Sequence, residues 1–103
     1  MEFKLKDILD NTSLISAEQG DKLFSILQKK IKDNSREEII IDFSGINDLT
    51  TAFINNGISR LFSYGDKEYL LKHMKFVGIT KKNHMGLLRL SILNAIKMEK
   101  WIL

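Results

Sequence analysis

The sequence predicts an α/β fold in which a small, mostly parallel β-sheet is packed with helices. Three observations lead to this prediction. The continuous β-branched run of residues 39–41 is typical of a buried central strand. Shorter apolar segments at residues 3–8 and 75–79 favour two further strands. Apolar residues at helical spacing fill the stretches between and after these segments, so strands and helices alternate along the chain.

Composition limits the architecture to one compact domain over residues 1–103, because 103 residues with 44% hydrophobic side chains fit a single core. The sequence contains no cysteine, which excludes disulfides and cysteine-based metal sites. The first residues mix charges with apolar side chains, and no apolar run approaches the roughly 20 residues that span a bilayer. We therefore expect a cytoplasmic domain with no membrane contact.

The N-terminal third is expected to form a strand, a turn and a helix. Phe3, Leu5 and Ile8 alternate with polar residues well enough for a short half-buried strand, and residues 10–13 read as a turn. Ser16 is a suitable N-cap, and the helix that follows is predicted to end at residues 33–35. The apolar positions that recur at helical spacing are Leu23, Phe24, Leu27 and Ile31.

The central segment is expected to form a strand covered on both faces, followed by a buried helix. Residues 39–43 are bounded by charges on one side and by Gly45 on the other. A broad apolar stripe over residues 53–62 predicts the helix, which should end near residues 63–65. Gly57 costs such a helix about 1 kcal/mol relative to alanine, so we expect it to allow close approach to the sheet.

The C-terminal segment is expected to add one strand and one helix. Residues 66–74 favour either a short helix or a loose connection, and residues 75–79 form the third strand candidate. Thr80 can cap the last helix, whose apolar positions extend towards Trp101.

The loop after the central strand is the candidate site, because ligands of open α/β sheets gather beyond the carboxyl ends of the strands. Gly45 stands alone there, so no phosphate-binding glycine pattern is present. Thr50 and Thr51 are predicted helix caps, with Asp48 competing for that role. Asp42 is interpreted as a structural carboxylate that accepts hydrogen bonds from loop N–H groups, beside Gly45.

The titratable residues do not predict an enzyme. His73 and His84 are the only histidines, they lie on different predicted elements, and both are expected at the surface. No ligand cluster predicts a metal site, and no nucleophile or second acid is fixed beside Asp42. We therefore expect no catalytic activity, no metal and no cofactor.

Charge is distributed unevenly along the chain. Residues 1–48 carry seven Lys/Arg against ten Asp/Glu, and residues 49–103 carry nine against three, so the C-terminal half is basic. A basic half can face phosphates, nucleic acid or an acidic protein, although scattered lysines are also typical of a solvated surface.

Residues 39–62 carry a family resemblance. The pattern IIIDFSGI, a loop with hydroxyl residues and the helix start AFINNGISRLF resemble the core of STAS domains, the anti-sigma-factor-antagonist-like modules of bacterial signalling. The pattern resembles the STAS-like family of unknown function more closely still. LISAEQGDKLF and KFVGIT resemble its preceding helix and following strand, so the resemblance covers roughly residues 13–85.

The resemblance implies a regulatory domain whose loop docks a protein partner, for which a histidine-kinase-like ATPase is a candidate. STAS antagonists carry an Asp-Ser-Ser/Thr-Gly motif whose second hydroxyl residue is phosphorylated. Alignment on Gly45 and Ile46 places Thr50 at the acid, Thr51 at the first hydroxyl and Ala52 at the phosphoacceptor position. A shift of one residue would offer Thr51 as the acceptor instead, but we expect its hydroxyl to satisfy N–H groups at the helix start.

The predicted function is therefore non-catalytic signalling or regulation through protein–protein contact. The sequence does not predict the oligomeric state. The candidate partner surface comprises Asn47, Asp48, Thr50, Thr51, Asn55, Asn56, Ser59 and Arg60. The alternative is a nucleic-acid-associated regulator that uses Lys75, Lys81, Lys82, His84 and Arg89.

Overall fold

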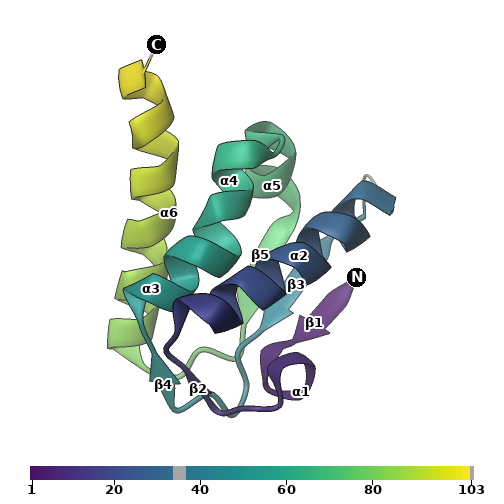
Figure 1. Ribbon diagram of the computed structural model, residues 1–103, viewed down its shortest axis with the longest axis vertical. Helices are drawn as coiled ribbons and strands as arrows, with labels where there is room; N and C mark the ends of the chain where they lie inside the picture. Colours follow the sequence, from purple (N-terminus) through teal and green to yellow (C-terminus); the bar gives the residue numbers. More distant parts are fainter. Residues whose placement is uncertain (34–36, 103) are drawn as a thin grey trace.

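The chain folds around a parallel sheet of three strands, in the order β1–β3–β5 (Figure 1). A computed structural model describes residues 1–33 and 37–102, with side chains described as far as residue 96. Strands β1 (Glu2–Lys4), β3 (Ile39–Asp42) and β5 (Met74–Val77) pair in parallel, with Phe3 and Phe76 both in register with Ile41. Strands β2 (Ser13–Leu14) and β4 (Asp48–Leu49) form a second, two-stranded parallel sheet. The α/β prediction with parallel strands and alternating helices is thus confirmed.

Seven helical segments connect and cover the strands in the described chain. They are α1 (Leu5–Leu9), α2 (Ala17–Asp33), α3 (Thr51–Ile54), the π-helical segment η1 (Asn55–Ser59), α4 (Arg60–Tyr64), α5 (Lys67–His73) and α6 (Lys82–Ile102). Segments α3, η1 and α4 follow one another without a break and form the helix predicted after the central strand. Within the described chain, no helix combines the length and the apolar character needed to span a membrane.

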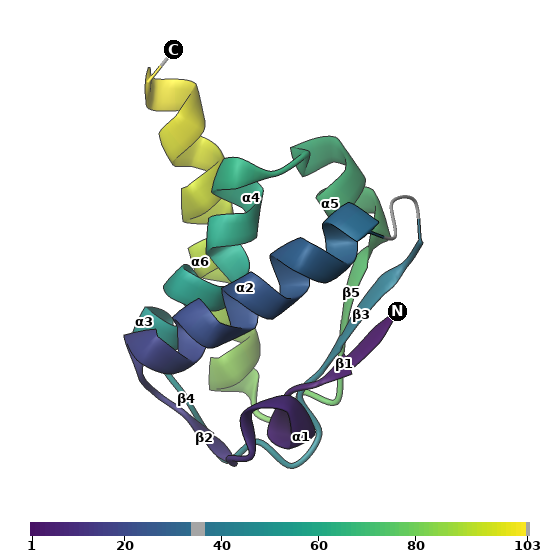
Figure 2. The same cartoon turned by 45° about the vertical axis from the view of Figure 1, so that its right-hand side comes forward.

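The main sheet is covered by helices on one side only. Figure 2 shows α2, α4 and α5 on the same side of the strands, and no helix of the described chain lies against the other side. In β3, Ile39 and Ile41 are buried whereas Ile40 is half-buried, so the side chains alternate between core and surface. The prediction that this strand is covered on both faces is therefore wrong, because its apolar run reflects strand propensity as well as burial.

The start of the chain differs from the predicted strand. Strand β1 ends at Lys4, and the chain turns at once into α1, which buries Leu5 and Leu9 one helical turn apart. Asp10 ends α1 in the left-handed conformation with φ 49°. The predicted turn at residues 10–13 is therefore shorter than expected, because Ser13 already pairs with Asp48 in the second sheet.

Helix α2 begins as the sequence predicts. The Ser16 hydroxyl accepts a hydrogen bond from the Gln19 amide (3.1 Å), and the Gln19 side chain accepts one from the Ser16 amide (3.0 Å). This reciprocal capping box satisfies N–H groups that have no partner inside the helix. The helix extends to Asp33, and the rest of its predicted end lies outside the described residues.

Helix α2 and segment η1 cross at two glycines. A Cβ at Gly57 would lie 3.3 Å from the Cα and carbonyl oxygen of Gly20, and a Cβ at Gly20 would lie 2.8 Å from the Phe53 carbonyl oxygen. The close approach at Gly57 is thus made to α2 and not to the sheet, which corrects the sequence-based expectation. The physical reason for the glycine is the one expected, since any side chain would push two backbones apart.

The C-terminal segment contains the predicted strand and helix. Residues 67–73 form helix α5 rather than a loose connection, and β5 follows directly. Helix α6 begins at Lys82, so Lys81 precedes it and Thr80 is not its cap. The backbone helix extends past Trp101, whose side chain lies outside the described part.

Candidate functional site

The carboxyl end of β3 is held by a hydrogen-bonded turn. Oδ1 of Asp42 accepts hydrogen bonds from the amide (2.8 Å) and the hydroxyl (2.6 Å) of Ser44. These bonds, first the hydroxyl and then the amide, keep the pKa of Asp42 below its usual value, against an opposing effect of burial. A structural role in this loop was expected for Asp42, and the two hydrogen bonds to Ser44 give that role its geometry.

Two glycines shape this turn. Gly78 has φ +77°, and a Cβ there would lie 2.5 Å from both Asp42 Oδ1 and Ser44 Oγ. Gly45 has φ +80°, with the Lys6 side chain 3.1 Å from the position of a Cβ. The sequence pointed to Gly45 but not to Gly78, because Gly78 meets the turn only through the pairing of β3 with β5.

The candidate loop after this turn is held by hydrogen bonds at the start of β4. The amide of Asn47 donates to the Thr12 carbonyl (2.8 Å), and the Lys81 ammonium donates to the Asn47 carbonyl (2.7 Å). The Asp48 carboxylate accepts a hydrogen bond from the Ser13 hydroxyl (2.6 Å). Asp48 therefore links the two strands of the second sheet. It does not cap the following helix, a role for which the sequence had made it a candidate.

Thr50 is the residue that caps α3. Its Oγ1 accepts from the Phe53 amide (3.3 Å) and donates to the Ile15 carbonyl (2.9 Å). Thr51 is the first residue of the helix and is exposed, and its hydroxyl takes no part in the cap. The expectation that the Thr51 hydroxyl satisfies N–H groups at the helix start is therefore wrong, because the chain is extended at Thr50 and already helical at Thr51.

Segment η1 brings the next candidate residues against α6. Ser59 was expected on the exposed face of the helix, but it is only 3% exposed and its hydroxyl lies 2.6 Å from that of Ser91. The Ser91 hydroxyl donates to Oδ1 of Asn55, so its single hydrogen is used there and Ser59 must donate to Ser91. Ser59 is thus a structural contact to α6, and Asn55 keeps its amide hydrogens at the surface.

Arg60 is fixed from two sides. Its guanidinium lies 4.0 Å above the centre of the Phe24 ring, and Nη1 lies 3.1 Å from Oδ1 of Asp21. Stacking and the ion pair together orient the planar group, although the pair itself is exposed and contributes little to stability. Asn56 donates from its side chain to the Ala17 carbonyl at 3.5 Å.

These residues border one open polar groove. The groove has a volume of about 610 Å³ and runs between α2, η1, α4 and α6. Most of the residues that line it carry a hydroxyl, carboxamide or charged group: Asp21, Asn55, Asn56, Ser59, Arg60, Ser63, Tyr64, Ser91, Asn94 and Ala95. The structure thus brings together Asn55, Asn56 and Arg60 of the predicted surface. The loop residues Asn47, Asp48, Thr50 and Thr51 do not line the groove.

A scan against protein-family models matches residues 19–84 to the STAS-like domain of unknown function (DUF4325). The chain belongs to this family. The matched segment contains all but the first two residues of α2, the central strand, the candidate loop and the π-helical segment, and it is close to the extent expected from the sequence. Searches among curated proteins and among solved structures found no match.

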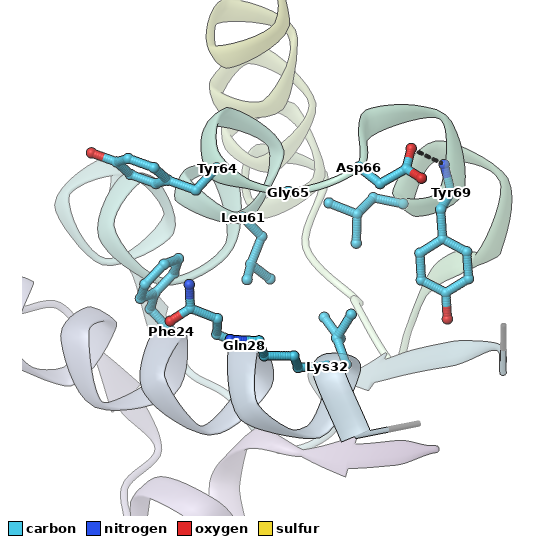
Figure 3. Close-up of a pocket in the computed structure, with 10 residues that line it drawn as sticks. Phe24, Gln28, Lys32, Leu61, Tyr64, Gly65, Asp66 and Tyr69 are labelled. Carbon is cyan, nitrogen blue, oxygen red and sulfur yellow. Dashed lines mark hydrogen bonds between the residues drawn. The ribbon is translucent and has the colours of Figure 1, made fainter. Parts of the chain in front are cut away.

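This STAS-like domain has a second, apolar cleft that the sequence did not indicate. The cleft has a volume of about 320 Å³ and lies between α2, α4 and α5 (Figure 3). Phe24, Leu61 and Leu70 contribute its apolar surface, and Lys32 and Asp66 place opposite charges at it. Asp66 already caps α5 through the Tyr69 amide (3.2 Å). No spacing in the sequence indicates the cleft, because three separate helices form it.

His84 does not lie at the surface of the domain. It is only 6% exposed, and this burial, followed by the nearby Lys81, lowers the pKa of its imidazole, while Asp48 opposes the shift. The expected exposed position is wrong because the first turn of α6 packs His84 inward. His73 is half-buried and lies 4.8 Å from the Tyr69 ring, centre to centre.

The basic residues of the nucleic-acid alternative are thus reduced to four. The exposed members of the predicted set are Lys75, Lys81, Lys82 and Arg89. Lys81 is engaged with the Asn47 carbonyl. Among the described residues, no group of three or more His, Asp or Glu side chains is placed to hold a metal ion.

Proposed function

We propose that this STAS-like domain is a non-catalytic regulatory module that binds a protein partner through the loop at residues 47–51 and the adjoining polar groove. The observation that carries the proposal is the groove itself, which joins Asn55, Asn56 and Arg60 on one open surface. Carboxamide side chains donate and accept hydrogen bonds at once, which suits contact with the backbone or polar side chains of another protein. Arg60 is held in a fixed orientation by Phe24 and Asp21, so little side-chain entropy is lost when it binds.

The partner that the family resemblance favours is a histidine-kinase-like ATPase. Two features of the surface support a macromolecular partner. The loop leads directly into α3, the groove begins at Asn55 one helical turn after Thr51, and the groove is open rather than enclosed. A partner that covers both would bury a continuous surface made from the loop, η1 and α4.

Direct binding to a kinase-like ATPase encoded beside the gene in the native host tests the proposal. Arg60→Glu should weaken binding by about tenfold or more, because it reverses a charge at the centre of the contact. Lys72→Glu makes the same charge change on the exposed side of α5 and is the matched control. Asn47→Arg, in the loop, should weaken binding without the loss of ring stacking that accompanies Arg60→Glu.

Two results would contradict the proposal. One is that Arg60→Glu and Asn47→Arg bind the ATPase with the same affinity as the wild type. The other is retardation of DNA or RNA that is lost steeply with salt and depends on Lys75 and Lys82, which would favour the nucleic-acid function.

The same surface is expected to act without phosphorylation. The aligned acceptor position is Ala52, which has no hydroxyl, and Thr51 lies one residue earlier at the start of α3. Intact-protein mass spectrometry of material from the native host should therefore show the unmodified mass. A phosphate-sized increase that disappears in Thr51→Val would show instead that the domain is a phosphorylation switch.

A further inference from the structure

Helix α6 exposes an apolar stripe on the side that faces away from the domain. Gly86, Leu90 and Leu93 follow one another at helical spacing, and Met85 and Arg89 lie directly beside them. Leu90 is 56% exposed, Leu93 43% and Met85 38%, whereas Leu88 and Ser91 face the core. We name Met85, Gly86, Arg89, Leu90 and Leu93 the outer stripe. Figures 1 and 2 show α6 at the edge of the molecule, with its C-terminal half rising beyond the other helices.

Gly86 in this stripe is not required by the fold. A Cβ at Gly20, Gly57 or Gly65 would lie 3.3 Å or less from other atoms of the domain, and Gly45 and Gly78 have positive φ. A Cβ at Gly86 would meet nothing within 4 Å. Glycine in an exposed helix costs about 1 kcal/mol of stability relative to alanine. Because a Cβ at Gly86 would meet no neighbour, no packing contact within the described domain offsets this cost. A flat position between exposed apolar side chains is what close packing of a second helix requires.

The charges along α6 select the kind of partner. Residues 82–96 contain Lys82 and Arg89 and no acidic residue. A second copy of the chain, paired through the outer stripe, would bring the Arg89 side chains of two stripes together, and the stripe itself contains no acid to neutralise them. A lipid surface would have to accommodate the Arg89 guanidinium in the middle of the inserted apolar stripe. A protein helix with carboxylates beside an apolar row fits the outer stripe in two ways. Its apolar row can pack against the exposed leucines, and its carboxylates can pair with Arg89.

We propose that the outer stripe of α6 docks an amphipathic helix of a protein partner, with acidic residues flanking its apolar row and with Gly86 at the closest approach. This surface shares no residue with the polar groove, whose lining residues from α6 are Ser91, Asn94 and Ala95. It also lies beyond the residues 19–84 that match the family model.

Titration with designed helical peptides tests the proposal. The probe is a synthetic peptide with leucine at heptad positions a and d and glutamate at e and g, and the control is the same peptide with lysine in place of glutamate at e and g. The acidic peptide should shift the backbone amide resonances of residues 85–93 and bind less tightly as salt is added, whereas the lysine peptide should not bind.

Three variants assign the binding to the outer stripe. Leu90→Gln should weaken peptide binding by about tenfold, since it removes an exposed apolar side chain that the bound peptide would cover. Leu71→Gln is the matched control, because Leu71 is 57% exposed on α5 and lies outside the stripe. Gly86→Ala should raise the melting temperature of the domain and yet weaken the peptide complex, a combination that a purely structural role of Gly86 would not give.

Several outcomes would overturn the proposal. They are failure of the acidic peptide to bind, equal binding of both peptides, and unchanged affinity of Leu90→Gln or Gly86→Ala. Sedimentation that shows a dimer of the free protein, lost in Leu90→Gln, would assign the stripe to a second copy. Tighter binding to anionic phosphatidylglycerol vesicles than to the acidic peptide, also lost in Leu90→Gln, would assign it to a membrane surface.

Discussion

At the scale of single residues, the turn after β3 depends on three residues at the carboxyl ends of two neighbouring strands. Asp42 and Ser44 form the hydrogen bonds, and Gly78 leaves the space for them because any Cβ there would overlap both polar groups. The turn fixes where the candidate loop leaves the sheet. Its stability is therefore linked to the position of the proposed partner surface.

Replacement of Asp42 by asparagine tests this turn. Asp42→Asn should lower the free energy of unfolding by about 1–2 kcal/mol, because it replaces two charge-assisted hydrogen bonds by weaker ones. Urea denaturation near neutral pH measures the change, and Asp7→Asn on the exposed side of α1 is the control. Superimposable unfolding curves for Asp42→Asn and the wild type would remove Asp42 from this role.

Two neighbouring threonines offer a sharper comparison at the start of α3. Thr50→Val removes the cap and should cost about 1 kcal/mol, because the Phe53 amide loses its acceptor. Thr51→Val should change stability by less than about 0.5 kcal/mol, since the Thr51 hydroxyl is exposed and outside the cap. Thermal unfolding of the two variants checks the difference, and the reverse order would contradict the assignment of the cap to Thr50.

At the scale of elements, α2 and η1 cross closely because Gly20 and Gly57 have no side chains at the crossing. A Cβ at Gly20 would lie 2.8 Å from Asn56 Cβ and from the Phe53 carbonyl oxygen, so the helices themselves would have to separate. A Cβ at Gly57 would meet its neighbours at 3.3 Å, which requires a smaller shift. The π-helical turn lies at this crossing and directs Ser59 towards α6.

Alanine at each glycine of the crossing should therefore destabilise the domain by different amounts. Gly20→Ala should lose about 1–3 kcal/mol through overpacking, in spite of the better helix propensity of alanine. Gly57→Ala should also lose stability, but less than Gly20→Ala. Chemical denaturation ranks the two variants, and a stabilised Gly20→Ala would show that the helices are not in close contact there.

At the scale of the whole molecule, acid is expected to weaken the fold through His84. Its pKa in the folded protein is lowered from 6.5, so the unfolded chain binds a proton more readily than the folded one. Above pH 6.5 the imidazole is neutral in both the folded and the unfolded protein, and protonation costs the fold nothing. As the pH falls below 6.5 and through the lowered pKa of the folded protein, the free energy of unfolding decreases. Asp42, whose pKa is lowered from 3.8, adds a loss of the same sign only below that value.

Substitution of His84 isolates its contribution to this pH dependence. The free energy of unfolding of the wild type should fall between about pH 7 and about pH 5, and that of His84→Gln should fall less. Urea denaturation at both pH values measures the two slopes. If the free energy of unfolding falls equally with pH in both proteins, protonation of His84 does not destabilise the fold.

Much of the secondary structure was determined by the sequence. Ser16 and Gln19 form a capping box from local spacing, and Ile39–Asp42 become a strand through β-branched side chains. Asp42 and Gly45 were also identified, because an acid and a glycine at a strand end have few other roles. The family pattern lies in this same local segment, which is why it was recognisable from the residues.

The tertiary structure alone decided which side chains meet. Ser59 became a buried partner of Ser91, and His84 entered the interior, because α6 packs where the sequence suggested a free surface. Gly57 approaches Gly20 rather than the sheet, and Gly78 lies on the Asp42 turn through strand pairing. Local patterns specify which side of an element is apolar. The element that covers it is set by contacts between residues far apart in the chain, and that information is not carried by any short stretch of sequence.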